Sequence, residues 1–412
     1  MKGISAPERR DEEWNLRVEG KPYPVQVPDF YQVEGIWSED GIQKGLRGAT
    51  GLRLCFISDG RSIHTQRWAG YFGKSHEVHL ITYDPMGCSI AGVTEHVIPS
   101  RFENLYLSFW PRHIRVRRLI RDIDPDLVHA QFITKYGFHL TLGSRWPTLV
   151  SAWGDDILIL PPKSRLIRAF TKRVLEGVDL VYAVSQDLRN HIVGDFGISP
   201  DKVRYLPIGI DTGVFSTVHR ETEPGRSIVL FSNRGFFPVY DTRTLLAGFA
   251  SARKVNPGIS LVLKGDGPEE DEMRRLVTSL NLSGAVIFKE RTEYSDVPGD
   301  LQGADIFIST ATSDGTPVSV LEAMSTGLPC IATQVGGVPE WIVDRENGLL
   351  IPPGDPEAVS RAILTLSGDP LLRRQLGASA RETVRERADW GRLMVQVEDD
   401  YKRLIEGRGG GR

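Results

Sequence analysis

The 412-residue sequence has only three cysteines, no long apolar run and no excess of positive charge. Cys55, Cys88 and Cys330 lie far apart, and their odd number speaks against a scaffold of paired disulfides. No apolar run reaches the length of about 18 residues that a transmembrane helix needs. The net charge of −3 lacks the excess of Lys and Arg required to bind a nucleic-acid polymer. We therefore expect none of these three classes of protein.

The N-terminal residues do not have the composition of a secretory signal peptide. The segment MKGISAPERRDEEW is charged where a signal peptide is apolar, so we expect a cytoplasmic protein. Contact with the inner membrane surface stays open. Residues 1–50 are rich in charge, proline and glycine without a sustained period, which predicts an N-terminal extension lying partly across the folded body.

Two series of alternating segments make up the rest of the chain. Apolar runs of strand length alternate with amphipathic stretches over 51–210 and again over 227–388. This pattern predicts an α/β protein with two Rossmann-like, doubly wound domains, the first completed by a C-terminal helix within 389–412. Residues 211–226 combine turn residues with mixed charge and are expected to be a linker. The carboxyl ends of both sheets should then face one cleft, where ligands bind in open α/β folds.

The segment STATSDGTPVSVLEAMSTGLPCIAT (309–333) is the most informative part of the sequence. Thr316 followed by Pro317 predicts a helix start, with the hydroxyl as N-cap. The SDG loop before it would present backbone N–H groups and the positive end of a helix dipole, which suit a phosphate or diphosphate. Asp314 and Glu322 are eight residues apart, one in the loop and one in the helix.

This segment resembles the Glu-x7-Glu signature of retaining, nucleotide-sugar-dependent glycosyltransferases of family 4, which have the two-domain GT-B fold. The blocks LPIGIDTGVF (206–215), LVLKGDGPEE (261–270) and GGVPEWIVDRENGLLIPPGDPEAV (336–359) extend the resemblance over about 50–405. It implies metal-independent transfer of a sugar from a nucleotide diphosphate sugar to an acceptor hydroxyl, without a cofactor. The acceptor could be a lipid-linked sugar, a glycan or a small molecule.

Two alternatives to a transferase remain open. The first is a GT-B sugar-nucleotide epimerase or phosphorylase. The second is a catalytically silent glycosyltransferase-like subunit that binds a partner. Neither the nucleotide base nor the donor sugar follows from the sequence.

The resemblance also implies roles on the donor side. Glu322 would bind the ribose hydroxyls, and Asp314, in place of the family's first glutamate, would contact the sugar. Arg234, in FSNRGFFPVYD, takes the arginine position of the diphosphate clamp. The diphosphate would also meet the backbone of Gly315, Thr316, Pro317 and Val318.

One cation of the usual diphosphate clamp is missing. The lysine position, five residues after Arg234, is Val239. Lys264 or Arg243 could supply the second charge.

The N-terminal domain departs from the family pattern at a histidine. The family often has His-Gly-x-Asp near the reacting sugar carbon, and this chain has Trp153-Gly154-Asp155-Asp156. Trp153 and Asp156 are therefore expected to contact the sugar or the acceptor, the indole by stacking rather than by proton transfer.

Two histidines and one arginine are further candidates. His64 follows the first strand on a loop-to-helix turn and is expected in the active site, and Arg67, one turn on, should face the acceptor. His129 ends a strand and is either an active-site or a structural histidine.

Neither a metal site nor a definite membrane site follows from the charged residues. No Cys or His spacing suggests zinc, and Asp122-Ile123-Asp124 precedes a proline at a helix end, so we expect no metal ion. Two basic stretches, near 112–121 and 163–173, are either solvated helix faces or contacts with anionic lipid.

Overall fold

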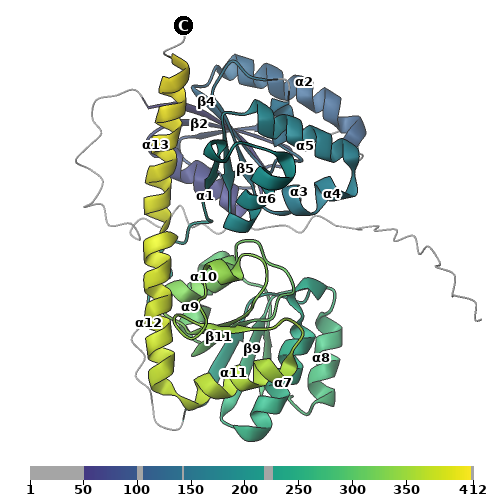
Figure 1. The fold of residues 1–412 in the computed structure, drawn as a ribbon, viewed down its shortest axis with the longest axis vertical. Helices are drawn as coiled ribbons and strands as arrows, with labels where there is room; N and C mark the ends of the chain where they lie inside the picture. Colours follow the sequence, from purple (N-terminus) through teal and green to yellow (C-terminus); the bar gives the residue numbers. More distant parts are fainter. Residues whose placement is uncertain (1–50, 100–104, 142, 218–225, 410–412) are drawn as a thin grey trace, which may run out of the picture.

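The computed structural model describes residues 51–99, 105–141, 143–217 and 226–409. The expected extension, 1–50, and most of the expected linker lie outside these described residues. Figure 1 shows two α/β domains, one above the other, with a long C-terminal helical column along one side of both. The prediction of two doubly wound domains is confirmed.

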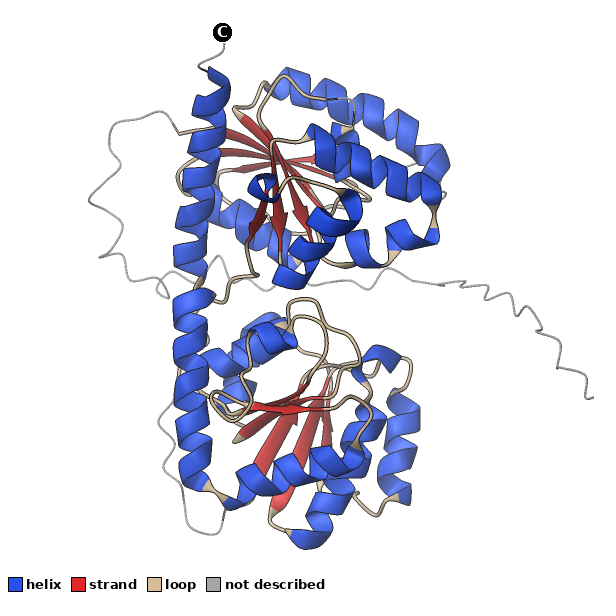
Figure 2. Cartoon of the chain, in the orientation of Figure 1, coloured by secondary structure: helices blue, strands red, loops and turns tan. Residues whose placement is uncertain are grey.

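The N-terminal domain is built on a seven-stranded, all-parallel sheet with the order β3-β2-β1-β4-β5-β6-β7. The central strands β4 and β5 are buried over their whole length, because helices cover both faces of the sheet (Figure 2). The strands are β1 (Arg53–Ile57), β2 (Glu77–Thr82), β3 (Val93–Val97), β4 (Leu127–Gln131), β5 (Thr148–Ala152), β6 (Leu180–Ala183) and β7 (Val203–Tyr205). The helices are α1 (Ile63–Phe72), α2 (Leu105–Ile123), α3 (Asp155–Leu158), α4 (Leu160–Lys163), α5 (Arg165–Gly177) and α6 (Gln186–Phe196).

The C-terminal domain repeats this plan with a six-stranded parallel sheet of order β10-β9-β8-β11-β12-β13. Its strands are β8 (Ile228–Ser232), β9 (Ile259–Lys264), β10 (Val286–Lys289), β11 (Ile306–Ser309), β12 (Cys330–Thr333) and β13 (Leu349–Ile351). Its helices are α7 (Thr242–Val255), α8 (Glu270–Ser279), α9 (Val297–Gln302), α10 (Val318–Ser325), α11 (Pro356–Gly368) and α12 (Pro370–Arg387).

The last helix, α13 (Trp390–Gly409), returns to the N-terminal domain, as predicted. Trp390, Met394 and Tyr401 are buried in the same apolar cluster as residues of β1, α1 and β2. At the junction, Ile210 donates its N–H to Ala388 O at 2.8 Å and accepts from Trp390 N at 2.9 Å. These bonds join the chain leaving the N-terminal domain to the start of α13, and this junction is called the hinge below.

Candidate active site

The SDG loop between β11 and α10 is held by a second loop that contains Gly336 and Gly337. A Cβ on Gly336 would lie 1.9 Å from the carbonyl oxygen of Asp314, and one on Gly337 would lie 1.9 Å from that of Gly315. Gly337 also donates its N–H to Asp314 O at 2.9 Å. Only glycine permits this close backbone contact, so the two glycines of the 336–359 block support the SDG loop.

The start of α10 differs from the prediction. The helix begins at Val318 with Pro317 at the N-cap position, and no side chain caps it. The predicted N-cap role of Thr316 is wrong, because its hydroxyl donates to Val184 O of the other domain at 2.7 Å.

This geometry limits which backbone groups can receive a diphosphate. Pro317 has no N–H, and the N–H of Val318 donates to Thr316 O at 2.8 Å. The N–H groups of Gly315 and Thr316 have no acceptor among the described residues. Two of the four residues expected to bind the diphosphate through N–H groups therefore retain that capacity.

Arg234 and Asp314 come together beside this loop. The Arg234 guanidinium donates to Asp314 Oδ2 and to Ser319 Oγ, each at 2.7 Å, and lies 4.4 Å from the centroid of the Tyr240 ring. Its Nε is buried and has no partner among the described residues. Burial raises the pKa of Asp314, and the charge and hydrogen bond of Arg234 oppose that rise. The pair combines a positive charge with an unused donor next to the free N–H groups.

The two residues expected to replace the missing clamp lysine have counterions elsewhere. Lys264 is buried and pairs with Asp300, and Arg243 pairs with Glu272 on α8. Val239 itself is partly exposed on the short turn before α7. Among the described residues, neither Lys264 nor Arg243 is therefore free to act beside Arg234 as the second cation of the expected diphosphate clamp.

Glu322 is 3% exposed and accepts a hydrogen bond from Tyr294 Oη at 2.6 Å. Burial raises the pKa of Glu322 to about 7, while the Tyr294 hydrogen bond and the charges of Arg67 and Arg234 lower it. Arg67 belongs to α1 of the N-terminal domain. The sequence predicts that Arg67 faces the acceptor, and in the structure its charge acts on Glu322.

Arg67 is held at the hinge rather than free in solution. Its guanidinium donates to Gly209 O at 3.2 Å and stacks 4.2 Å from the centroid of the Trp390 ring. A cation–π contact and a backbone acceptor thus fix the guanidinium where the two domains meet.

Trp153 lies at the boundary between the domains, next to His64. The centroids of the two rings are 5.1 Å apart, and the carbonyl oxygen of Trp153 is 3.8 Å from the position of a Cβ on Gly315. The buried indole Nε1 has no partner among the described residues. Burial and the nearby charge of Arg67 lower the pKa of His64 to about 4, so this imidazole is neutral at pH 7.

Asp156 does not present the contact surface that was expected of it. Its side chain is 0% exposed and accepts the backbone N–H groups of Ile133, Trp153 and Gly154 at 2.8, 2.9 and 3.0 Å. Burial raises its pKa to about 6 despite these hydrogen bonds. In this structure the residue joins the loops after β4 and β5 and thereby positions Trp153.

His129 is a structural histidine. It is fully buried, with Nδ1 at 2.7 Å from Tyr401 Oη and Nε2 at 2.8 Å from Ser151 Oγ. Burial lowers its pKa to about 3. Nδ1 thus fastens α13 to the N-terminal sheet, and Nε2 links β4 to the neighbouring strand β5.

A carboxylate that no sequence motif marks as functional joins the two domains. Glu340 of the C-terminal domain accepts the N–H groups of Gln186 and Asp187, at 2.9 and 3.0 Å, at the N-terminus of α6. The carboxylate thus caps the positive end of a helix dipole in the other domain.

Among the described residues, no group of three or more His, Cys, Asp or Glu is placed to hold a metal ion.

Comparison with known proteins agrees with this geometry. The family model "Glycosyltransferase Family 4" matches residues 58–214, and "Glycosyl transferases group 1" matches residues 217–383. The chain belongs to glycosyltransferase family 4.

Curated relatives support an enzyme that uses a nucleotide sugar. This glycosyltransferase is 26% identical over 305 residues to a GDP-mannose-dependent alpha-(1-6)-phosphatidylinositol monomannoside mannosyltransferase of Mycobacterium tuberculosis, covering 69% of this chain and 78% of the relative. It is 28% identical over 295 residues to N-acetyl-alpha-D-glucosaminyl L-malate synthase of Bacillus anthracis, covering 67% and 74%. The acceptors named for these relatives differ.

Solved structures confirm the GT-B fold of the glycosyltransferase. Anabaena HepE in complex with UDP aligns with a TM-score of 0.70 and 18% identity, over 85% of this chain and all of that one. Sucrose-phosphate synthase from Thermosynechococcus elongatus aligns with a TM-score of 0.71 and 20% identity, over 86% of this chain and all of that one.

The contact of Glu340 with α6 predicts how a neutral variant of the glycosyltransferase will behave. Glu340→Gln should destabilise the observed domain arrangement by about 1–2 kcal/mol, because hydrogen bonds to a charged group are about twice as strong as neutral ones. Small-angle scattering should then show a larger radius of gyration than for the wild type. Glu382→Gln, at an exposed surface pair, is the control. Superimposable scattering profiles for Glu340→Gln and the wild type would show that Glu340 does not hold the two domains in the observed arrangement.

Trp153 should act in the glycosyltransferase through its ring surface. We expect Trp153→Phe to keep most activity and Trp153→Ala to raise the acceptor KM by about tenfold, since stacking and water exclusion are lost. Trp153→His should not exceed the wild type. Acceptor-dependent release of nucleoside diphosphate measures all three, and a histidine variant several-fold faster would mean that the position lacks a proton acceptor.

Proposed function

We propose that this glycosyltransferase transfers a sugar from a nucleotide diphosphate sugar to an acceptor hydroxyl with retention of configuration and without a metal ion. The observation that carries the proposal is the grouping of Arg234, Asp314 and Glu322 around the SDG loop and α10, where Arg234 bonds Asp314 and its charge acts on Glu322. Anion-binding donors and a buried carboxylate are the groups needed for a diphosphate and for ribose hydroxyls, respectively.

In the proposed reaction, the bond between the sugar anomeric carbon and the diphosphate oxygen breaks while the acceptor oxygen attacks from the same face. Arg234 and the N–H groups of Gly315 and Thr316 would stabilise the charge that develops on the leaving diphosphate. The acceptor proton would pass to an oxygen of that diphosphate. His64, neutral at pH 7, would lie beside the reacting groups without being required as the base.

Arg67 would complement the single clamp arginine from the opposite domain. Its charge already influences Glu322, and its position depends on Gly209 and Trp390 at the hinge. Assembly of the donor site would therefore depend on the domain arrangement, as in enzymes that close around their substrates.

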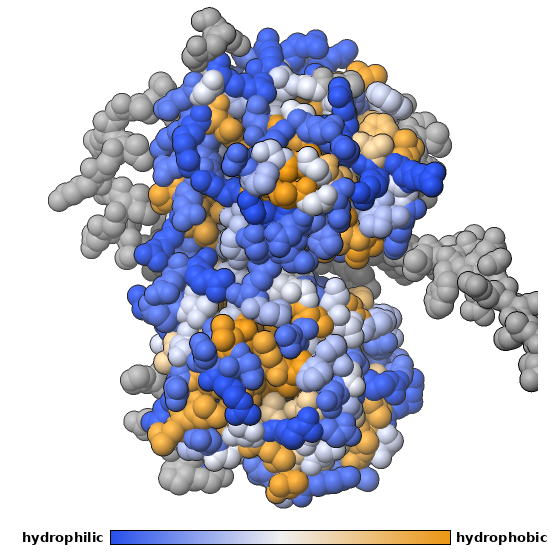
Figure 3. Space-filling view, in the orientation of Figure 1, coloured by the Kyte–Doolittle hydropathy of each residue, from blue (hydrophilic) through white to orange (hydrophobic). Residues whose placement is uncertain are grey.

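A peripheral contact with anionic lipid is a further part of the proposal. Trp110 and Ile114 of α2 and Leu166 of α5 are 57%, 59% and 59% exposed, among the arginines and lysines of the same helices. Figure 3 shows apolar side chains among charged ones at this edge of the N-terminal domain. Within the described part of the chain, no helix is long and apolar enough to cross a bilayer.

A thermal-shift screen with EDTA tests the donor part of the proposal. A nucleoside diphosphate sugar at 100 times its Kd should stabilise the folded protein by about 2.7 kcal/mol and raise Tm, because it binds only the folded state. Conversion of one nucleotide sugar into another would identify an epimerase, and consumption of phosphate a phosphorylase. Binding without any turnover over a broad acceptor panel would favour the silent subunit.

A further inference from the structure

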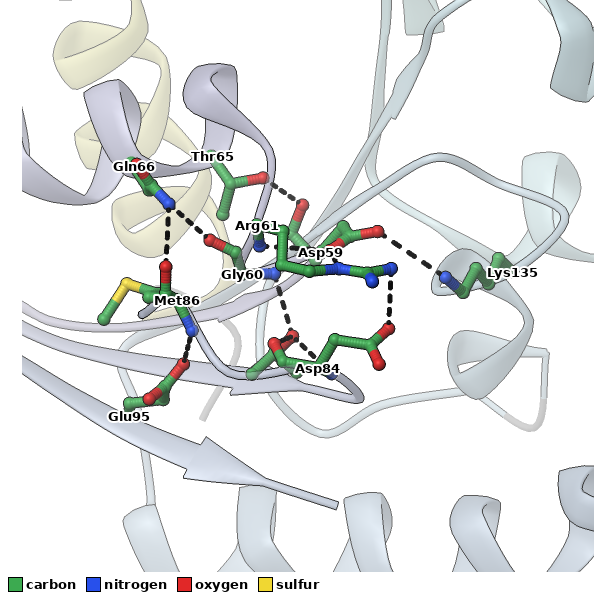
Figure 4. Close-up of polar contacts among 11 residues, drawn as sticks. Asp59, Gly60, Arg61, Thr65, Gln66, Asp84, Met86, Glu95 and Lys135 are labelled. Atoms are coloured by element: carbon green, nitrogen blue, oxygen red, sulfur yellow. Dashed lines mark hydrogen bonds and ion pairs between the residues drawn. The ribbon is translucent and has the colours of Figure 1, made fainter. Parts of the chain in front are cut away.

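A row of four side chains with alternating charge lies at the carboxyl edge of the N-terminal sheet (Figure 4). Arg61 Nη2 is 3.1 Å from Asp84 Oδ2, Arg61 Nε is 3.6 Å from Asp59 Oδ1, and Lys135 Nζ is 3.7 Å from Asp59 Oδ2. The four residues come from the loops after β1, β2 and β4. All are partly exposed, so the row remains accessible to a ligand.

Buried polar atoms without partners accompany this row. The hydroxyl of Tyr136 belongs to a side chain that is 2% exposed, and it has no hydrogen-bond partner among the described residues. Gln131 Nε2, at the end of β4, and Thr134 Oγ1, in the loop after it, are also buried and without a partner among the described residues. Lys135 Nζ lies 4.9 Å from the centroid of the Tyr136 ring. Unpaired buried polar groups are uncommon in folded proteins, so their concentration on one segment points to a polar ligand.

The row is adjacent to the active site described above. Arg61 lies three residues before His64, on the loop that leads into α1. Asp156 accepts the N–H of Ile133 and that of Trp153, and so fixes the loop carrying Lys135 relative to Trp153. The sheet order places the ends of β2, β1, β4 and β5 side by side.

The charge pattern indicates the chemistry of the ligand. Two cations and two carboxylates cancel, and sugar hydroxyls can donate to Asp59 and Asp84 while accepting from Arg61 and Lys135. Lys135 has spare donor capacity, because its pairing distance to Asp59 exceeds hydrogen-bond length. An anionic acceptor would be attracted by the two cations but would also be repelled by both carboxylates.

We propose that Asp59, Arg61, Asp84 and Lys135 form an acceptor subsite for the hydroxyl groups of a neutral sugar ring. The inference rests on the proposed function, since it names the acceptor class of that reaction. Arg112, whose guanidinium is 4.0 Å from the centroid of the Tyr83 ring, adds a cation nearby. An anionic acceptor is therefore the alternative against which the experiment is designed.

The test measures acceptor binding by saturation-transfer difference NMR on the full chain, without a donor. The neutral probes are methyl α-mannoside and maltose, and the anionic probes are L-malate and glucose 1-phosphate. We expect saturation transfer to the neutral sugars, with Lys135→Gln and Arg61→Gln weakening their affinity about tenfold or more. Tyr136→Phe, which removes only the buried hydroxyl, should act in the same direction. Lys402→Gln, at an exposed lysine paired with Glu398 on α13, is the matched control and should bind like the wild type.

Three outcomes would overturn the inference. These are preferential binding of the anionic probes, unchanged binding of neutral sugars by all three variants, and no saturation transfer to any probe. Circular dichroism of each variant separates a lost contact from a lost fold. Failure of the proposed function would appear differently, as the absence of donor binding in the thermal-shift screen while neutral sugars still bind.

Discussion

Replacing Arg234 by alanine should lower the maximal transfer rate by about 10²–10³-fold, the usual cost of removing one donor to a developing anion. Arg234 is bonded to both Asp314 and Ser319, and its Nε has no partner among the described residues and so remains available to a ligand. Charge on the diphosphate oxygen increases as the bond to the sugar breaks. The guanidinium should therefore contribute more to the transition state than to the bound donor, and kcat should fall more than donor affinity.

The comparison requires kcat and donor Kd for the same protein. Initial rates at saturating donor give the first, and calorimetry gives the second. Arg243→Ala is the matched control, because Arg243 lies in the same domain but pairs with Glu272 on the surface. Equal losses in kcat and in donor affinity for Arg234→Ala would show a binding role only.

Replacing Glu322 by glutamine should weaken binding of the nucleotide sugar about ten- to hundredfold, as expected for hydrogen bonds to a charged group. The carboxylate is the acceptor proposed for the ribose hydroxyls, and an amide keeps its size while removing its charge. Tyr294 would keep a partner, so the fold should be retained. Calorimetry with Glu382→Gln as control checks this result, and an unchanged donor Kd would contradict the assigned role.

The raised pKa of Glu322 also predicts a pH dependence. Its value of about 7 means that the carboxyl group becomes protonated as pH falls from 8 to 6. If donor binding requires the carboxylate, affinity should fall about tenfold over this range and approach its full strength above pH 8. The dependence should be lost in Glu322→Gln. A donor Kd in the wild type that is flat between pH 6 and 8 would mean that Glu322 does not titrate there.

Local sequence patterns were sufficient to predict the architecture and the position of the SDG loop in the candidate site. Apolar runs of strand length between amphipathic stretches predict both parallel sheets, because each signal depends on neighbouring residues. The predicted SDG loop is likewise local, since it follows from the strand before it and the helix after it. Asp314 and Arg234 are brought together by the sheet order, in which β8 and β11 are adjacent.

The partners that complete the site depend on tertiary contacts, which local patterns do not encode. Tyr294 reaches Glu322 from a short turn before α9, and no motif marked it. Glu340 lies inside the GGVPEW block, but its bonds are to the other domain. For the same reason, the hydroxyl of Thr316 was wrongly expected to cap its own helix.

Burial explains the remaining difference. Asp156 matches a family position and was expected to face the ligand, yet three backbone N–H groups surround its carboxylate. A sequence identifies a carboxylate but does not show which of its possible donors lie within reach. Predicting which loop residues contact a ligand therefore requires the structure, whereas strands can be predicted from the sequence.

The stereochemistry of transfer tests the central claim most directly. The donor that raises Tm most would be incubated with an accepted sugar in the presence of EDTA, and the anomeric configuration of the first product would be read by proton NMR. We predict a product with the same configuration as the donor, at a rate unaffected by EDTA. An inverted product, or a rate abolished by EDTA and restored by a divalent cation, would contradict the proposed mechanism.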